Sequence, residues 1–451
     1  MSGVALVYGI ALAGDALAGQ LSRRGWKLLI ADDAATDAKR QLAAALGVTL
    51  IESPTAVEIA ALVAGADMVC PAPGVPETHS VVLAALAAGT PLRTEIDLAY
   101  EWEQQRPGGP RPMLAVTGTD GKTTTTLLTA HILEAGGRRV AAVGNTEVPL
   151  AAALDDDVDV FVVECSSFRL NWLQSFRAEA SVWLNLAPDH QNWHTSMSSY
   201  EAAKARMWAH RRVTDVAIGW ADDPTVMDNL RAAGGRTRTF AAAGADYRIE
   251  AGDLVGPEGV IAAVAGMTRT LPHDLTNALA AAALVLETGL ATAADVRRGL
   301  ATFQHPPHRI EPLGIINGVQ WFNDSKATSP HAALTAIRSF DKVVLLAGGL
   351  NKGLDLASLA SEHEHVKAVV GLGRAAGEVT GPFEEFCPTR TATSMAQAVQ
   401  FASELAEPGD VVLLSPACAS FDWYPGGGYP ARGDDFKQLV QALTGTRSDP
   451  A

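Results

Sequence analysis

The chain is poor in cysteine and has no long apolar run. Four cysteines occur among its 451 residues (Cys70, Cys165, Cys387 and Cys418), far apart and without a Cys-x-x-Cys pair. This spacing indicates neither a disulfide framework nor a zinc site. No run reaches the ~18 consecutive apolar residues that a membrane helix needs. The apolar stretch from Val4 to Leu12 has no basic region before it, so it predicts a first strand and not a signal peptide.

Basic residues are outnumbered by acidic ones. The 35 lysines and arginines stand against 50 aspartates and glutamates, which leaves a formal net charge of −15. This charge argues against nucleic acid or an anionic membrane surface as a partner. An anionic substrate must then be held by local lysines, arginines and helix N-termini. We expect a monomeric enzyme in the cytoplasm, with no nucleic-acid partner and no insertion into a membrane.

The order of apolar and polar segments predicts three domains of the α/β class. Residues 1–98 alternate short apolar strands with helical patterns, as nucleotide-binding units of Rossmann type do. Residues 99–305 form a central domain, and residues 306–451 alternate strands and helices again. Residues 104–112 hold three prolines and two glycines, which is typical of a linker. The predicted strands of the first domain are Val4–Tyr8, Lys27–Ala31 and Met68–Cys70.

A glycine-containing turn follows the first predicted strand. Residues 9–14 (Gly-Ile-Ala-Leu-Ala-Gly) have the position of a dinucleotide-binding fingerprint, but Ala11 occupies the place of its second glycine. Asp32 and Asp33 close the second strand, where a ribose-binding acid stands in such folds. A plain α/β turn explains the glycines equally well.

The segment from Met113 to Thr126 is the most informative one in the chain. A short apolar run, Met113–Val116, predicts a buried strand that breaks at glycine and leads into a helix. Glycines let backbone N–H groups approach an anion, and the helix dipole favours negative charge, so the turn predicts a phosphate-binding loop. The loop residues are Gly118, Thr119, Asp120, Gly121, Lys122, Thr123 and Thr124.

The loop departs from the strict P-loop pattern at one position. That pattern has a glycine five positions before Gly121, where this chain has Val116. Lys122 suits the outer phosphates of a nucleotide, and the Thr123 hydroxyl suits Mg²⁺. A glycine-rich turn without a ligand is the alternative, although Gly-Lys-Thr has little other use at a helix start.

Three polar residues of the central domain stand out. Glu164 directly follows the predicted strand Asp159–Val163, where a nucleotide-bound Mg²⁺ finds a carboxylate ligand; a helix-capping acid is the alternative. His190 follows the apolar run Ser181–Leu184 and could ligate a second metal or orient a phosphate. Lys204 lies in a helical segment, and by composition alone it is a solvated lysine on a helix face.

The third domain carries a second group of candidates. Arg309 is a planar donor that can clamp a phosphate with two hydrogen bonds. Asp324 and Lys326 follow an apolar strand, and such a loop can hold a ribose through the acid and a transferring phosphoryl group through the lysine. A helix-capping turn is the alternative. Lys352 and Ser420 follow two further strands, at the sheet edge where open α/β sheets bind ligands.

Taken together, these motifs resemble those of the Mur ligases, ATP-dependent amide ligases of peptidoglycan precursor synthesis. The resemblance covers nearly the whole chain in order. It rests on the segments Gly118–Thr123, Glu164–Leu170, Asp189–His190, Tyr200–Arg206, His308–Arg309, Asn323–Thr328 and Leu414–Asp422. Within the family, residues 324–328 and 415–420 are most similar to the members that add glutamate. The Asp-Asn-Pro-Arg motif of the relatives that add diaminopimelate or lysine is absent from the sequence.

The resemblance implies an α/β, three-domain Mur ligase architecture. Rossmann-like N-terminal and C-terminal domains, which bind the UDP-substrate and glutamate, surround a central P-loop ATPase-like domain that binds ATP. The implied substrates are UDP-N-acetylmuramoyl-L-alanine, glutamate and ATP. The implied cofactor is Mg²⁺, as two ions, and the implied intermediate is an acyl phosphate.

The resemblance also assigns roles to single residues. The implied catalytic residues are Lys122, Lys204, His190 and Lys326. The implied metal ligands are Thr123, Glu164, His190 and Lys204 as its carbamate, an anion that replaces the solvated cation. Nucleotide contacts are expected from the phosphate loop, Asn277, Arg309 and Asp324. Contacts with the UDP-substrate or glutamate are expected from Leu12, Asp32, Asn145, Thr328, Lys352, Ser420 and Phe421.

Several residues depart from the family pattern. Asp120 and Asp274 stand where asparagine is usual, and Glu147 lies in a segment expected close to the phosphates. Unpaired carboxylates would repel ATP there. The resemblance favours D-glutamate as the added isomer, and L-glutamate followed by epimerisation is the alternative, because a related ligase adds L-glutamate. A catalytically silent nucleotide-binding paralogue is a further alternative, although it would have little use for Lys122 and Lys204 together.

Overall fold

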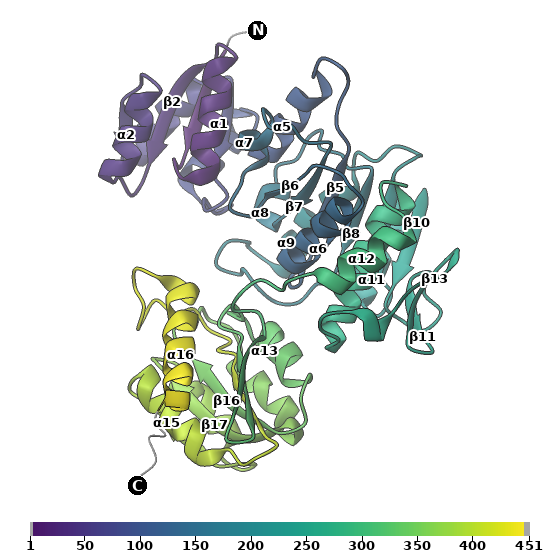
Figure 1. Cartoon of the computed structure of the whole chain (residues 1–451). Helices are drawn as coiled ribbons and strands as arrows, with labels where there is room; N and C mark the ends of the chain where they lie inside the picture. Colours follow the sequence, from purple (N-terminus) through teal and green to yellow (C-terminus); the bar gives the residue numbers. More distant parts are fainter. Residues whose placement is uncertain (1–2, 446–451) are drawn as a thin grey trace. The chain divides into compact units, whose positions relative to one another are not determined.

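The computed structural model describes residues 3–445, which belong to two compact units (Figure 1). The first unit holds residues 1–186 and 190–303, and the second holds residues 187–189 and 304–451. The large sheets of both units are built from strands that alternate with helices, so the predicted α/β class is confirmed.

The N-terminal sheet has four parallel strands in the order β3-β2-β1-β4. Its strands are β1 (Val4–Tyr8), β2 (Lys27–Asp32), β3 (Leu50–Glu52) and β4 (Met68–Pro71), and its helices are α1 (Leu12–Arg23), α2 (Asp37–Ala45), α3 (Ala56–Ala64) and α4 (Ser80–Ala88). Helices cover both faces, so neighbouring residues such as Leu6 and Val7 are both buried. The sequence predicts three of these strands and misses β3, because three residues are too few for a periodic pattern.

The central sheet has six parallel strands in the order β10-β9-β8-β5-β7-β6. Its strands are β5 (Met113–Thr117), β6 (Val140–Gly144), β7 (Val160–Glu164), β8 (Ala180–Trp183), β9 (Val216–Trp220) and β10 (Arg236–Phe240). The strands predicted to begin at Asp159 and Ser181 are β7 and β8, and each begins within one residue of its predicted start.

Helices pack on both faces of the central sheet. They are α5 (Glu95–Gln104), α6 (Lys122–Ala135), α7 (Leu150–Ala153), α8 (Ser167–Leu170), α9 (Met197–Ala205), η1 (Arg206–Trp208), α10 (Pro224–Ala233), η2 (Val264–Gly266), α11 (Pro272–Glu287) and α12 (Ala293–Thr302). Leu114 and Val116 of β5 share a core with α6 and α11, whereas Met113 and Ala115 share one with α5 and α7. A small antiparallel sheet, β11 (Arg248–Glu250), β12 (Asp253–Gly256) and β13 (Gly259–Ala263), completes the unit.

The second unit contains a six-stranded sheet in the order β14-β15-β19-β16-β17-β18. Only the pairing of β14 with β15 is antiparallel. The strands are β14 (Glu311–Ile316), β15 (Val319–Asn323), β16 (Val343–Gly348), β17 (Val366–Leu372), β18 (Thr389–Thr391) and β19 (Val411–Leu414). The helices are α13 (Pro330–Ile337), η3 (Leu356–His365), α14 (Ala376–Thr380), η4 (Gly381–Phe383), α15 (Met395–Leu405) and α16 (Gly428–Gly445).

The predicted linker connects α5 to β5 and is anchored by a buried ion pair. Arg111 is 7% exposed, and its Nη2 lies 2.7 Å from Oε2 of Glu103. The same guanidinium donates to the backbone carbonyls of Leu154 (2.8 Å) and Asp156 (2.7 Å). This connection is therefore fixed on the central sheet. The domain boundary predicted at residues 98 and 99 stays a prediction.

Helix α5 joins the two sheets of the first unit through Asp97. This residue is fully buried, and its Oδ1 accepts the backbone N–H groups of Ser175 and Phe176 at 2.8 Å each. Its Oδ2 lies 2.9 Å from Nη2 of Arg93. One carboxylate thereby connects the chain that leaves the N-terminal sheet with a loop of the central one.

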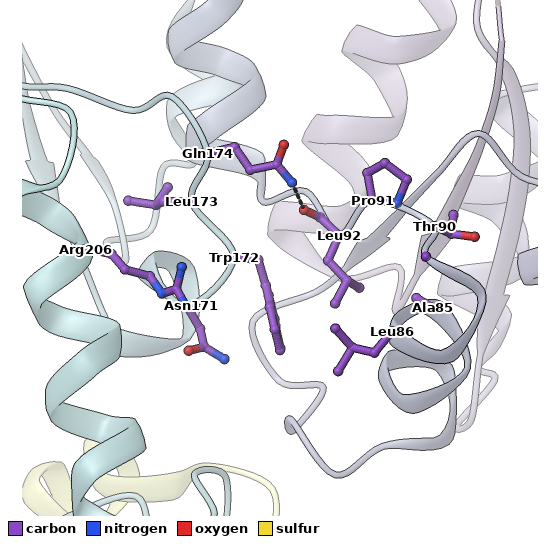
Figure 2. A pocket seen from close by; sticks show the side chains of 11 residues that line it. Ala85, Leu86, Thr90, Pro91, Leu92, Asn171, Trp172, Leu173, Gln174 and Arg206 are labelled. Atoms are coloured by element: carbon purple, nitrogen blue, oxygen red, sulfur yellow. Dashed lines mark hydrogen bonds between the residues drawn. The ribbon is translucent and has the colours of Figure 1, made fainter.

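A cavity lies at the same junction (Figure 2). Gln174 Nε2 donates to the carbonyl of Leu92 at 3.1 Å beside it, and Leu86 and Trp172 line its walls. Its volume is about 280 Å³, and none of the predicted site residues lines it. Within residues 3–445, no helix is both long and apolar enough to cross a bilayer.

We expect Asp97→Ala to lower the free energy of unfolding of the first unit by about 3–5 kcal/mol, because the N–H groups of Ser175 and Phe176 lose their acceptor and Arg93 loses one of its two carboxylate partners. Urea titration followed by circular dichroism measures this loss. Asp228→Ala is the control, since its pair with Arg231 is exposed and should contribute nothing measurable. Equal stability of the two variants would contradict the assignment.

Candidate active site

The predicted phosphate loop connects β5 to α6. Gly118 has φ of +155° and Gly121 has φ of +81°. A Cβ on Gly121 would lie 2.7 Å from Oδ1 of Asn277, so the loop needs glycine there for both conformation and space. The first turn of α6, with half-buried Lys122 and Thr123 and buried Thr124, directs its free backbone N–H groups out of the helix. Such N–H groups suit an anion.

The loop is held in shape by a residue that the sequence analysis misses. Oδ1 of Asn185 accepts the backbone N–H groups of Thr119 and Asp120, each at 2.9 Å. Asn185 lies just after the end of β8, and β8 pairs with β5 along the sheet. The strand-end argument that singles out Glu164 applies equally to Asn185, so the signal was present in the sequence.

Two lysines converge on one carbonyl group of the loop. Nζ of Lys122 donates to the carbonyl oxygens of Gly118 (2.8 Å) and Thr119 (2.6 Å). Nζ of Lys204 donates to the carbonyl oxygen of Gly118 at 2.6 Å. Lys204 is only 1% exposed, so its interpretation from composition as a solvated lysine is wrong. Helical propensity does not reveal which face of α9 packs under the loop.

Tyr200 contacts both Lys204 and the loop. Its hydroxyl is 3.1 Å from Oγ1 of Thr119, and Nζ of Lys204 is 4.5 Å from the centre of its ring. A ring face at that distance attracts a cation. Tyr200 and Lys204 are four residues apart on α9, a spacing that places both on one helix face and that the sequence displays.

Glu164 ends β7 beside the loop, because Val116 of β5 pairs with it along the sheet. It is 1% exposed, and its Oε1 accepts Nδ2 of Asn145 at 3.0 Å. Among the described residues, its buried Oε2 has no hydrogen-bond partner. A buried carboxylate oxygen without a donor is suited to a cation. The predicted substrate residue Asn145 therefore lies next to the predicted metal ligand.

His190 lies in the loop after β8, in a left-handed conformation with φ of +57°. Its ring is 4.6 Å from that of Phe168 and 6.0 Å from that of Tyr200, each in an edge-on arrangement. Within residues 3–445, no three His, Cys, Asp or Glu side chains gather as a metal cluster. Mg²⁺ does not require one, because it takes one or two carboxylates together with substrate phosphates and water.

Helix α11 places Asn277 and Asp274 beside the loop. Oδ1 of Asn277 accepts the hydroxyl of Thr125 at 3.1 Å. Asp274 is 2% exposed and is paired with Arg269, whose Nε and Nη2 donate to it at 2.7 and 2.8 Å. Its carboxylate also accepts the backbone N–H of Leu271 at 3.1 Å. The unusual acid at position 274 is thus balanced by an adjacent guanidinium.

Leu12 and Asp32, the two substrate contacts predicted in the N-terminal domain, differ in their surroundings. Leu12 begins α1 and is 58% exposed. Asp32 ends β2, where its carboxylate accepts Nζ of Lys39 (2.6 Å) and the backbone N–H groups of Ile10 and Ala34 (2.9 Å each). Burial by itself raises the pKa of Asp32, but these hydrogen bonds outweigh it and hold the pKa below its ordinary value. Asp32 therefore braces the Gly9–Gly14 turn as a carboxylate.

The second unit holds the predicted loop after β15. Asp324 is 7% exposed and accepts the hydroxyl of Ser415 at 2.8 Å and the backbone N–H of Ile310 at 3.2 Å. It therefore connects the half-buried Arg309 segment to β19. Lys326 lies in the same loop, and half-buried Thr328 precedes the start of α13. The contacts of Arg309, Asp324 and Lys326 with a nucleotide stay predictions.

The two other predicted loops of the second unit are joined by backbone hydrogen bonds. Leu350 donates to Ala419 at 2.8 Å and Ala419 donates back at 3.1 Å, which brings the exposed Lys352 and the buried Ser420 onto adjacent loops. Within the described residues, Oγ of Ser420 has no hydrogen-bond partner. Phe421, the next residue, is 55% exposed.

Arg432 and Tyr429 of α16 contact the loop after β15, and no local pattern in the sequence marks either residue. Arg432 is 2% exposed, and its guanidinium donates to Oγ (2.9 Å) and the carbonyl (2.8 Å) of Ser325. Burial lowers the pKa of Arg432 to about 10. Nζ of Lys326 is 3.9 Å from the centre of the Tyr429 ring.

Two family models match the chain. The Mur ligase middle domain matches residues 116–285, and the Mur ligase glutamate ligase domain matches residues 308–418. The UDP-N-acetylmuramoylalanine–D-glutamate ligase of Frankia casuarinae is 40% identical over 457 aligned positions, which cover 98% of this chain and 94% of the relative. The enzyme of the same name from Myxococcus xanthus is 37% identical, with 97% and 98% covered.

A solved structure shares the fold. The MurF ligase of Thermotoga maritima in complex with ADP superimposes with a TM-score of 0.60 at 15% identity, over 97% of this chain and 95% of that one. At this identity the likeness concerns the fold alone. The three-domain Mur ligase fold is the one that the sequence motifs imply. The match to both domain models and to nearly full-length relatives settles the family: the chain belongs to the Mur ligases, the ATP-dependent amide ligases.

Proposed function

We propose that this enzyme joins D-glutamate to UDP-N-acetylmuramoyl-L-alanine at the expense of ATP, in peptidoglycan precursor synthesis. The observation that carries the proposal is the site at the Gly118 carbonyl, where Lys122 and Lys204 meet, together with Glu164, which ends the neighbouring strand β7 and has a buried oxygen without a donor. The names of the two relatives support D-glutamate over the L-isomer. The retained lysines argue against a silent paralogue.

The reaction transfers the γ-phosphoryl group of ATP to the alanine carboxylate, which gives an acyl phosphate and ADP. The glutamate amine then attacks the acyl carbon, loses a proton and expels phosphate through a tetrahedral intermediate. Two anions must meet in the first step, so their repulsion has to be screened. In the proposed mechanism Lys122 binds the outer phosphates, while Lys326 of the second unit steadies the phosphoryl group.

The residues beside the loop fit Mg²⁺. Glu164 offers a buried carboxylate oxygen without a donor, and the Thr123 hydroxyl stands at the start of α6. Two ions, with His190 as a further ligand, form part of the proposal. Bound Mg²⁺ would neutralise phosphate charge. Carbamylation of Lys204 would form a bond between Nζ and the carbon of CO₂ with loss of a proton, and so place an anion where the cation now lies.

The glutamate site is proposed on the second unit. Lys352 supplies a cation for a carboxylate, Ser420 supplies a buried hydroxyl, and Thr328 and Phe421 complete the pocket. Leu12, Asp32 and Asn145 are proposed to contact the UDP-substrate. Since its proposed substrates are nucleotides, we place the enzyme in the cytoplasm, and we propose that it acts as a monomer.

The isomer is tested by phosphate release from ATP in the presence of UDP-N-acetylmuramoyl-L-alanine and one glutamate isomer at a time. We expect release with D-glutamate and little with L-glutamate. Release with L-glutamate alone would transfer the chain to the L-adding relatives. No release with either isomer would refute the ligase function.

The phosphate loop is tested by Lys122→Ala. Loss of a cation that contacts the transferred group should lower phosphate release by about 10²-fold or more. The exposed Lys342, on the second unit, provides the matched control Lys342→Ala, which should retain full activity. Unchanged activity of the Lys122 variant would refute the loop assignment.

The Lys204 carbamate is tested by chemical rescue. Lys204→Ala should be inactive, and added short carboxylic acids should restore part of the activity because they supply the missing anion. The same acids added to Lys122→Ala should restore nothing, since that position needs a cation. Absence of rescue would leave Lys204 without support as a carbamate.

A further inference from the structure

A loop of the N-terminal sheet reaches the segment that carries His190 and leads into α9. This loop follows β4 and contains Pro73 and Glu77. Nε1 of Trp193 donates to the carbonyl of Pro73 at 2.9 Å. Oε1 of Glu77 accepts the backbone N–H of Thr195 at 2.9 Å and the hydroxyl of Ser199 at 2.8 Å.

The same oxygen of Glu77 is 3.0 Å from Nδ1 of His194. His194 is 2% exposed, and burial lowers the pKa of its ring despite the nearby Glu77 carboxylate. Because Glu77 can only accept, Nδ1 of the neutral ring carries the proton and Nε2 accepts the hydroxyl of Ser167, 2.9 Å away. Ser167 begins α8, three residues after Glu164.

The groups that Glu77 holds are continuous with the catalytic residues. Ser199 forms a capping box with Ser196 at the start of α9 and is followed directly by Tyr200. The Tyr200 hydroxyl is 3.1 Å from Thr119, and its ring lies against Lys204. The His194 ring is 5.2 Å from that of Tyr200. A shift of Glu77 therefore acts on α9 through its first turn and on Tyr200 through His194.

We propose that Glu77 is a positioning residue that couples the N-terminal sheet to the phosphate loop. By holding His194, Thr195 and Ser199, it sets the position of Tyr200 and Lys204 beneath Gly118. The loop after β4 adjoins the turn that the proposed UDP contact Asp32 braces, since a Cβ on Gly9 would lie 2.8 Å from that of Ala72. Occupancy of this region by the UDP-substrate is thereby transmitted to the site of phosphoryl transfer. The kinetic test of this coupling rests on the ligase function proposed above.

The kinetic test is Glu77→Gln, which keeps the size of the side chain and removes its charge. We expect kcat to fall about tenfold or more, because small misplacements of catalytic groups are costly. KM for ATP should change less than about threefold, since no ATP-binding residue is altered. Glu77→Asp, which retains the carboxylate, should recover part of kcat. Ser199→Ala should lower kcat in the same way, and the double variant should be no worse than Glu77→Gln.

The matched control is Glu101→Gln. Oε1 of Glu101 accepts the hydroxyl of Ser175 at 2.8 Å and lies 2.7 Å from Nη2 of Arg93, so the control removes a comparable hydrogen-bonded carboxylate charge away from α9. Its kcat should equal that of the unaltered enzyme. A kcat of Glu77→Gln within about twofold of the control would overturn the proposal. So would unchanged kcat in Ser199→Ala if the Glu77 variant fails to fold.

Hydrogen exchange tests the coupling without catalysis. Adding UDP-N-acetylmuramoyl-L-alanine should slow exchange in residues 72–80 and also in residues 193–204 of the unaltered chain. In Glu77→Gln the protection should be confined to residues 72–80. Equal protection of residues 193–204 in both proteins would overturn the coupling. A chain that shows this exchange pattern yet releases no phosphate would refute the ligase function and leave the coupling supported.

Discussion

A lysine buried beneath the phosphate loop is the constraint on which the first unit's candidate site depends. Removing an ammonium group from water costs several kcal/mol even after the protein relaxes. The Gly118 carbonyl and the face of Tyr200 offset part of this cost for Lys204. The loop must therefore turn the Gly118 carbonyl towards Lys204 while the N–H groups at the start of α6 stay available to an anion, and the φ of +155° at Gly118 permits this. Lys122 donates to the same carbonyl.

Neighbouring donors compensate the charge of the buried acidic side chains near this site. Asp274 is neutralised by Arg269, and its remaining hydrogen-bonding capacity is used to hold the start of α11. Glu164 is the exception, because one of its oxygens is paired with Asn145 while the other lacks a donor within the described residues. A chain with a net charge of −15 thus holds two lysines at this loop, and the pairing of Asp274 with Arg269 reduces the repulsion that the composition alone suggests.

Much of the fold and of the candidate site could be predicted because the information is local. The strand β1 has the predicted bounds, β5 starts at the predicted Met113 and ends one residue later than predicted, and the glycine turn after β5 is a phosphate loop in shape. Glu164 and Asp324 lie at strand ends as predicted. The three residues of β3 escaped prediction because so short a strand has no period. Arg432 escaped it because its partner Ser325 is 107 residues away.

By itself, the sequence determined the order of strands and helices, the loop glycines and the placement of polar residues directly after apolar runs. These features depend on neighbours within one or two turns of the chain. Only the tertiary structure decided that Lys204 is buried and that Glu77 holds His194. Those contacts span 86 and 117 residues. The first contact lies beside the central sheet and the second joins loops that follow strands of two different sheets. Burial there changes what a charged side chain can do.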